Sequence, residues 1–105
     1  MKKVQLMFFR REDINARVEE YRRTPGAVLL DVRETDEFQS GHIPGAVNLP
    51  LSQIEQAMLE KNELILVYCL RGTRSKQAVR RHEGMGYTKV KSIGGITGYK
   101  GELER

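Results

Sequence analysis

The sequence predicts an α/β fold with a mainly parallel sheet, organised as one domain over residues 1–105. Two continuous apolar runs, at 27–32 and 64–68, lack the alternation of a half-exposed strand, so they indicate strands covered on both faces. Helical patterns precede, separate and follow these runs, and strands that alternate with helices are typical of parallel sheets. A chain of 105 residues is long enough for one modest hydrophobic core.

The first third of the chain predicts a strand, a helix and a second strand. Residues 4–9 form the first expected strand. The spacing of apolar residues then predicts an amphipathic helix over 13–22. The Thr-Pro-Gly sequence at 24–26 ends this helix, because proline and glycine terminate helices. The apolar run at 27–32 is the second expected strand.

The middle of the chain predicts short elements. We expect one helical turn at 35–38, with Thr35 as its cap, and a short extended segment at 46–49. Ser52 is expected to cap the next helix, and Glu55 would complete a capping box with it. The expected apolar face of that helix has four members: Leu51, Ile54, Met58 and Leu59.

The last third predicts a strand, a turn, a helix and a final strand. The strand at 64–68 leads into a turn that contains glycine, and a helix is expected over 73–85. Gly86 stands where a left-handed helix stop is expected. The final strand is expected at 87–93, ended by the glycine pair at 94–95 and followed by a helical turn.

Polar or reactive side chains stand at the ends of the two continuous apolar strands. Asp31 lies at the end of the first strand, and Cys69 follows the second. In parallel sheets, functional sites form at the carboxyl ends of the strands. We therefore expect this edge of the sheet to hold the site.

The charge distribution favours a small anionic ligand. The formal net charge is +4, and seven basic residues between positions 71 and 91 are opposed by Glu83 alone. They are Arg71, Arg74, Lys76, Arg80, Arg81, Lys89 and Lys91. A field of this sign attracts anions. Nucleic acid is not an expected partner, because the sequence has no recognition motif and its aromatic residues are not interleaved with basic ones.

The sequence also limits the cellular setting. No apolar run approaches the ~20 residues of a membrane span, so we expect no membrane partner. The basic and apolar start of the chain has no small-residue cleavage site after it, and a cytoplasmic protein is expected. A single cysteine excludes an internal disulfide and a multi-cysteine metal site, so no metal is expected.

The chain's one cysteine is followed by the loop Leu70-Arg71-Gly72-Thr73-Arg74-Ser75. Glycine permits a sharp turn, and successive N–H groups in such a turn form an anion-binding nest. The helix that starts near Thr73 points its positive end at the same place, and arginine side chains add forked donors that match oxyanions. Such surroundings lower the pKa of a thiol. The loop therefore predicts a nucleophilic Cys69 beside a receptor for a small anion.

Other interpretations of Cys69 are a buried structural residue, a cysteine–histidine dyad and a metal ligand. A buried structural cysteine is not ordinarily followed by two nearby arginines. His42 stands in a Gly-His-Ile-Pro-Gly segment and is expected to bond to the backbone, while His82 is expected to pack on the inward face of its helix. No ligand spacing supports a metal site.

Three blocks of sequence stand in order along the chain. The first has Leu-Leu-Asp-Val-Arg at 29–33, Glu-Phe at 37–38 and Gly-His-Ile-Pro-Gly-Ala-Val-Asn at 41–48; the second has Val-Tyr-Cys-Leu-Arg-Gly-Thr-Arg-Ser at 67–75; the third has Gly-Gly-Ile at 94–96 with Tyr99. Together they resemble the motifs of the rhodanese-like domain family, and the resemblance covers most of the chain.

The resemblance implies a sheet of about five mainly parallel strands with helices on both faces. It also implies sulfurtransferase chemistry without a cofactor, in which Cys69 takes sulfur from thiosulfate or a similar anion and becomes a persulfide. A thiol, a protein thiol or cyanide would accept the sulfur. The N–H groups from Leu70 to Ser75 would hold the persulfide. Asp31 and Arg33 match family positions, where they either brace the loop or form a local ion pair. Thr73 and Ser75 either contact the anion or, as we expect, cap the helix.

Loop length distinguishes sulfur transfer from two alternatives. By resemblance, sulfurtransferases carry arginine or a similar residue five positions after the cysteine, whereas related phosphatases carry arginine six positions after it. Here Arg74 is five positions after Cys69, which favours sulfur over phosphate or arsenate. The other alternative is a non-catalytic module that binds a protein partner, but such modules usually lack the cysteine.

Overall fold

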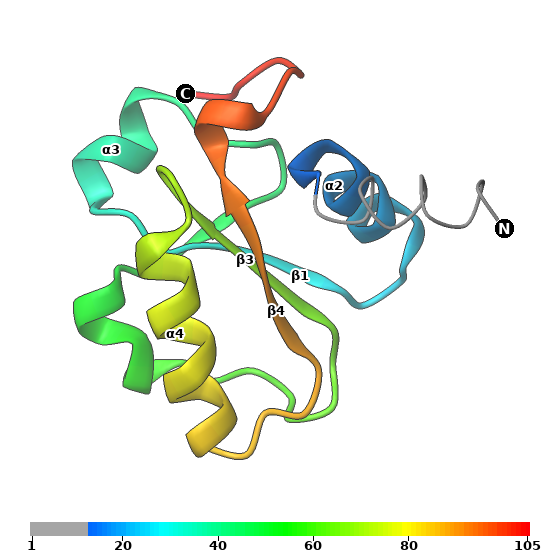
Figure 1. Cartoon of the computed structure of the whole chain (residues 1–105), viewed down its shortest axis with the longest axis vertical. Helices are drawn as coiled ribbons and strands as arrows, with labels where there is room; N and C mark the ends of the chain where they lie inside the picture. The colour runs from blue at the N-terminus through cyan, green and yellow to red at the C-terminus, as the bar shows by residue number, and fades with distance from the viewer. Residues whose placement is uncertain (1–12) are drawn as a thin grey trace, which may run out of the picture.

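A computed structural model describes residues 13–105, which form a four-stranded parallel sheet with helices on both faces (Figure 1). The sheet order is β2-β1-β3-β4. The strands are β1 (Val28–Asp31), β2 (Val47–Asn48), β3 (Ile65–Cys69) and β4 (Val90–Gly95). The expected parallel α/β fold is confirmed, with four strands among the described residues. The strand expected at 4–9 lies outside them.

The helical elements are α2 (Ile14–Arg23), α3 (Thr35–Ser40), the 3₁₀ helix η1 (Leu51–Gln56), α4 (Thr73–Gly84) and the 3₁₀ helix η2 (Ile96–Gly98). The sheet separates two hydrophobic clusters, because successive residues of a strand point to opposite faces. β3 is buried along its whole length and contributes to both clusters. None of the helices within residues 13–105 has the length and apolarity needed to cross a membrane.

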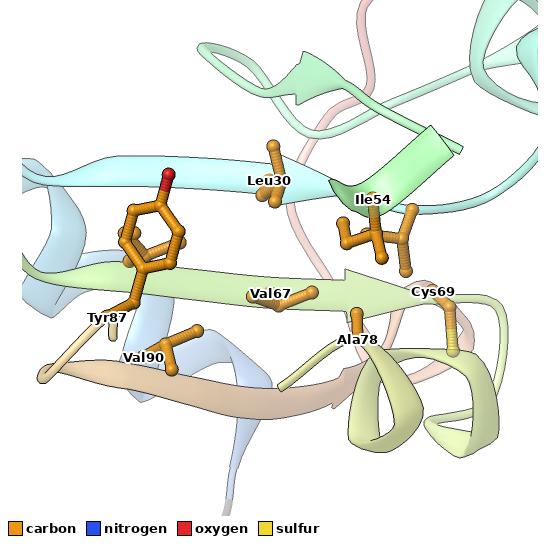
Figure 2. Packing of buried hydrophobic residues seen from close by; sticks show 9 residues of the cluster. Leu30, Ile54, Val67, Cys69, Ala78, Tyr87 and Val90 are labelled. Carbon is orange, nitrogen blue, oxygen red and sulfur yellow. The ribbon is translucent and has the colours of Figure 1, made fainter. Parts of the chain in front are cut away.

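One cluster lies between the sheet and α4 with η1, and Figure 2 shows its packing. Its members are Leu30, Val32, Ile54, Ile65, Val67, Cys69, Ala78, Tyr87 and Val90. The other cluster lies on the α2 side and contains Ile14, Val18, Leu29, Ile43, Leu66, Tyr68 and Ile93. Fully burying one such side chain contributes roughly 1.5–3 kcal/mol. Packing on both faces therefore holds β3 in place, and with it the position of its carboxyl end.

Two expected helix caps differ from the structure. Glu34, not Thr35, is the N-cap of α3, because Glu37 accepts the Glu34 N–H at 2.8 Å and completes a capping box. Pro50, not Ser52, precedes η1, and no side chain caps that element. A fixed proline φ suits the entry into a tight turn.

The helix expected after Ser52 is a short 3₁₀ helix that ends at Gln56. Ile54 is buried, as expected of its apolar face. Met58 lies beyond the helix end and is 95% exposed, so its assignment to that face is wrong. Leu51 and Leu59 are partly buried against the cluster under α4.

The final strand begins later and ends later than expected. β4 spans Val90–Gly95, and Tyr87 is buried in the preceding loop. Ser92 pairs with Val67, but the next pair in the ladder joins Tyr68 to Gly94. Ile93 is therefore the extra residue of a β-bulge. Gly94, at φ 103°, has the left-handed conformation that allows the strand to continue through the glycine pair.

Candidate functional site

Cys69 is the last residue of β3, at the carboxyl edge of the sheet, where the sequence places it. The strand extends one residue further than expected and includes the cysteine. Figure 2 shows Cys69 at the end of the strand, with its side chain directed toward the turn that opens α4. Cys69 is 1% exposed in the free protein. The thiol therefore lies against the first turn of α4 and is shielded from solvent.

The loop after Cys69 wraps its backbone N–H groups around the sulfur. The Gly72 N–H donates to Sγ at 3.0 Å, and the Ser75 N–H donates at 3.3 Å. Gly72 makes this possible with φ 108°, a conformation that side chains resist. The nest expected over 70–75 is present in this form, with two of its donors aimed at the sulfur.

These donors favour the thiolate. Burial of the Cys69 thiol works to raise its pKa, but hydrogen bonds from Ser75, Gly72 and the Arg71 N–H outweigh burial and lower the pKa. Hydrogen bonds to the charged form of a group stabilise that form. These hydrogen bonds therefore increase the fraction of Cys69 that is thiolate, the nucleophilic form of cysteine.

A pocket of about 180 Å³ opens beside the sulfur. It is lined by Cys69, Leu70, Arg71, Thr73 and Arg74. The pocket is thus lined by Cys69 and by four residues of the loop that follows it.

Arg74 is bound to a residue that sequence reasoning did not connect with the loop. Its guanidinium meets the Glu37 carboxylate with two hydrogen bonds, of 2.7 and 3.1 Å. The hydrogen bonds from Arg74 hold the pKa of Glu37 at about 2. Arg74 therefore ties the loop to α3, and much of its charge is neutralised. Arg71 is exposed and forms no ion pair within residues 13–105, which leaves it as the loop's free cation.

Ser75 does not cap α4, contrary to expectation. The N-cap is Gly72, and no side chain caps the helix. The buried Ser75 hydroxyl donates to the Gly72 carbonyl at 2.9 Å and lies 2.7 Å from the Ser92 hydroxyl. Thr73 is exposed at the pocket. Ser92 was not singled out from the sequence.

Asp31 and Arg33 form the local ion pair that was one of the two expectations. Arg33 Nη2 lies 2.7 Å from Asp31 Oδ2, and both side chains are buried. The same nitrogen donates to the Gly41 carbonyl at 2.7 Å. The pair therefore anchors the segment that begins at Gly41, and its hydrogen bonds do not go to the loop over 70–75.

Neither histidine bonds to the sulfur. His42 Nδ1 lies 2.9 Å from the Phe38 carbonyl, and its ring stacks on Phe38, as expected for a residue that shapes a turn. His82 is fully buried, with Nε2 3.2 Å from the Ile54 carbonyl. The backbone hydrogen bond expected of His42 and the packing expected of His82 are confirmed, and this geometry gives no support to a cysteine–histidine dyad.

Gly95 allows the loop to lie against β4. A Cβ atom at this position would overlap the Leu70 carbonyl and come within 2.5 Å of the Arg71 Cα. Thr97 holds the same carbonyl with its N–H and its hydroxyl, each at 3.3 Å. The glycine pair at 94–95 is visible in the sequence, but this close approach of backbone to backbone is visible only in the fold.

Comparisons with known proteins all point to the same family. The family described as Rhodanese-like domain matches residues 14–102. Thiosulfate sulfurtransferase PspE of Escherichia coli (strain K12) is 38% identical over 71 residues, which cover 64% of this chain and 68% of that protein. Thiosulfate sulfurtransferase GlpE of Pseudomonas savastanoi pv. phaseolicola is 37% identical over 75 residues, covering 70% and 71%.

A solved structure agrees with these relatives. The structure titled "rhodanese with anions from E. coli" superposes with a TM-score of 0.69 and 32% identity. The superposition covers 75% of this chain and 98% of that one.

Proposed function

The chain belongs to the rhodanese-like domain family, and we propose that it is a thiosulfate sulfurtransferase that carries sulfur as a persulfide on Cys69. The observation that carries the proposal is the pair of backbone N–H groups, from Gly72 and Ser75, directed at Sγ. They stabilise negative charge on a buried sulfur that would otherwise be costly to ionise.

In the first step the Cys69 thiolate attacks the outer sulfur of thiosulfate. A bond forms between Sγ and that sulfur, the S–S bond of thiosulfate breaks, and sulfite leaves with the electron pair. The free cation of Arg71 attracts the dianionic donor to the pocket. The N–H groups over 70–75, of which those of Gly72 and Ser75 already donate to Sγ, then hold the persulfide.

In the second step a thiolate, of a small molecule or of a protein, or cyanide attacks the terminal sulfur of the persulfide. The new bond forms as the S–S bond to Cys69 breaks, and Cys69 leaves as the thiolate that starts the next cycle. Two half-reactions through a covalent intermediate give ping-pong kinetics. The lowered pKa of Cys69 also makes it a better leaving group. A free thiol of this kind suits a reducing compartment, in line with a cytoplasmic location.

The geometry gives less support to the alternatives. A phosphatase would need the charge of Arg74 for phosphate, but its two terminal guanidinium nitrogens bind the Glu37 carboxylate, which neutralises much of that charge. A non-catalytic module has no need of a thiol with a lowered pKa. The ion pair of Asp31 and Arg33 supports the site indirectly, by anchoring the segment that begins at Gly41 to the end of β1.

The test is transfer of sulfur from thiosulfate to cyanide, together with mass spectrometry of the protein after thiosulfate treatment. We expect thiocyanate formation and one added sulfur atom on Cys69. Cys69→Ser should lose both, and serine keeps nearly the same shape. Sulfur transfer retained by Cys69→Ser would contradict the proposal, as would hydrolysis of an aryl phosphate by the wild type without any sulfur transfer.

A further inference from the structure

The hydrogen-bond network beneath the sulfur extends to β4. The buried Ser75 hydroxyl lies 2.9 Å from the Gly72 carbonyl and 2.7 Å from the Ser92 hydroxyl, and it also interacts with the Cys69 sulfur. A carbonyl oxygen and a thiolate only accept, so the single hydroxyl proton of Ser75 is directed to the Gly72 carbonyl and the sulfur. The Ser92 hydroxyl must then donate to Ser75 Oγ. The network runs from Ser92 through Ser75 to the Gly72 carbonyl and the sulfur.

The residues at the end of this network are the residues that hold the sulfur. Gly72 and Ser75 supply the two N–H donors to Cys69 Sγ. The Ser75 hydroxyl joins these two residues to each other, because it belongs to one and binds the carbonyl of the other. Whatever fixes that hydroxyl also fixes the spacing of the two N–H groups.

The β-bulge in β4 gives Ser92 its place in the network. Val90 and Ser92 are two residues apart and share the face of β4 that packs under α4, where Val90 joins the cluster. Ile93, the extra residue of the bulge, joins the cluster on the opposite face. Ser92 is thus the last residue of the regular ladder, directly before the strand bends. A serine is not required there for packing, since a valine would suit a strand better.

We propose that Ser92 is a positioning residue for the reaction: its hydroxyl orients that of Ser75, which holds the Gly72 and Ser75 N–H groups on the Cys69 sulfur. Ser92 does not touch the substrate. The inference rests on the proposed function only in taking the Cys69 thiolate as the nucleophile. It adds a residue of β4 to the site.

The test compares Ser92→Val with Ser92→Thr, two variants that are nearly equal in shape and differ in the hydroxyl. The pH dependence of Cys69 alkylation by iodoacetamide is measured, because only the thiolate reacts. We expect Ser92→Val to shift the profile to higher pH and to slow alkylation about threefold or more at pH 6, as loss of one ordered hydrogen bond implies. Rates at high pH, where every thiol is ionised, should agree with the wild type.

Ser92→Thr should keep the wild-type profile, and Ser52→Ala, at an exposed serine in η1, controls for loss of a serine hydroxyl elsewhere. A wild-type profile in Ser92→Val would overturn the inference, and so would an equal shift in Ser92→Thr. Alkylation requires no sulfur donor. A shift in a protein that transfers no sulfur would therefore refute the proposed function and leave this inference standing. Normal sulfur transfer by the wild type, with no shift in Ser92→Val, would support the proposed function and refute this inference.

Discussion

Arg71 and Arg74 stand three residues apart in one loop, yet their guanidinium groups have different surroundings. Arg74 is half-buried and binds Glu37 with both terminal nitrogens, so its contribution is to join the loop to α3. Arg71 is exposed at the pocket and has no ion-pair partner within residues 13–105. The attraction of an anionic donor therefore depends mainly on Arg71.

Arg71→Ala should reduce kcat/KM for thiosulfate about tenfold or more, since a hydrogen bond to a charged group is worth roughly 1.5–3 kcal/mol. The loss should appear mainly in KM and should shrink at high ionic strength, because salt screens exposed charges. Steady-state kinetics at two salt concentrations measure both effects. Lys76→Ala is the matched control, as it removes an exposed charge from α4 away from the pocket. Equal losses of kcat/KM in the two variants would contradict a specific role for Arg71 in attracting the donor.

The residues of the loop could be predicted from the sequence, but their partners could not. Cys69 ends a strand and Gly72 precedes a helix, and both elements have local sequence patterns, so the nest was predictable. Glu37 reaches Arg74 across a separation of 37 residues, and Ser92 reaches Ser75 across 17. No local pattern indicates such pairs, because they depend on how α3 and β4 pack against the loop.

At the scale of the element, local signals predicted α4 well and the short helices poorly. α4 has apolar residues at helical spacing and a glycine stop, and its bounds differ from expectation at the C-terminus by one residue. The caps of α3 and η1 were misassigned, because Thr35 and Ser52 are residues of favoured cap types that stand one or more positions inside the helix. Boundaries of short helices carry this ambiguity.

Gly84→Ala should raise the free energy of unfolding by about 0.5–1 kcal/mol. Gly84 is the last residue of α4, its φ is negative, and a Cβ atom there would meet nothing within 4 Å. Alanine therefore gains helix propensity without a clash. Urea unfolding measures the change.

Gly86→Ala is the matched control, since Gly86 is also open to solvent but has φ 97°. It should lower the free energy of unfolding by roughly 1 kcal/mol, the cost of a left-handed conformation for a residue with a side chain. A stabilising Gly86→Ala, or a destabilising Gly84→Ala, would show that the C-terminus of α4 has another conformation in solution.

At the scale of the whole molecule, a central strand buried on both faces determines the architecture. Two continuous apolar runs, which lack the alternation of a half-exposed strand, predicted a sheet covered on both faces, as is typical of parallel sheets. The bulge in β4 was not predicted, since it arises where the strand meets the loop of a neighbouring strand. One polar side chain in this core remains incompletely satisfied: among the described residues, His82 Nδ1 has no hydrogen-bond partner.

This buried histidine should make the stability of the protein depend on pH at values above those at which its carboxylates titrate. Burial lowers the pKa of His82 below its ordinary value of 6.5, because the charged ring would be desolvated between η1 and Tyr87. Below pH 6.5 the His82 ring therefore binds a proton in the unfolded chain but stays neutral in the folded protein until the pH reaches its lower pKa. The stability that His82 contributes is present above pH 6.5 and is lost as the pH falls toward its folded pKa.

The free energy of unfolding should fall as the pH is lowered from 7 to 5, with a slope from this group of at most about 1.4 kcal/mol per pH unit. Glu37 contributes nothing in this window, because its stabilising pair is lost only between pH 4.5 and about 2. His82→Gln keeps a neutral amide that can donate to the Ile54 carbonyl, and it should flatten the dependence. His42→Gln, at the chain's other histidine, should leave it intact. Urea unfolding at half-unit pH steps gives the slopes, and a slope unchanged in His82→Gln would place the titrating group elsewhere.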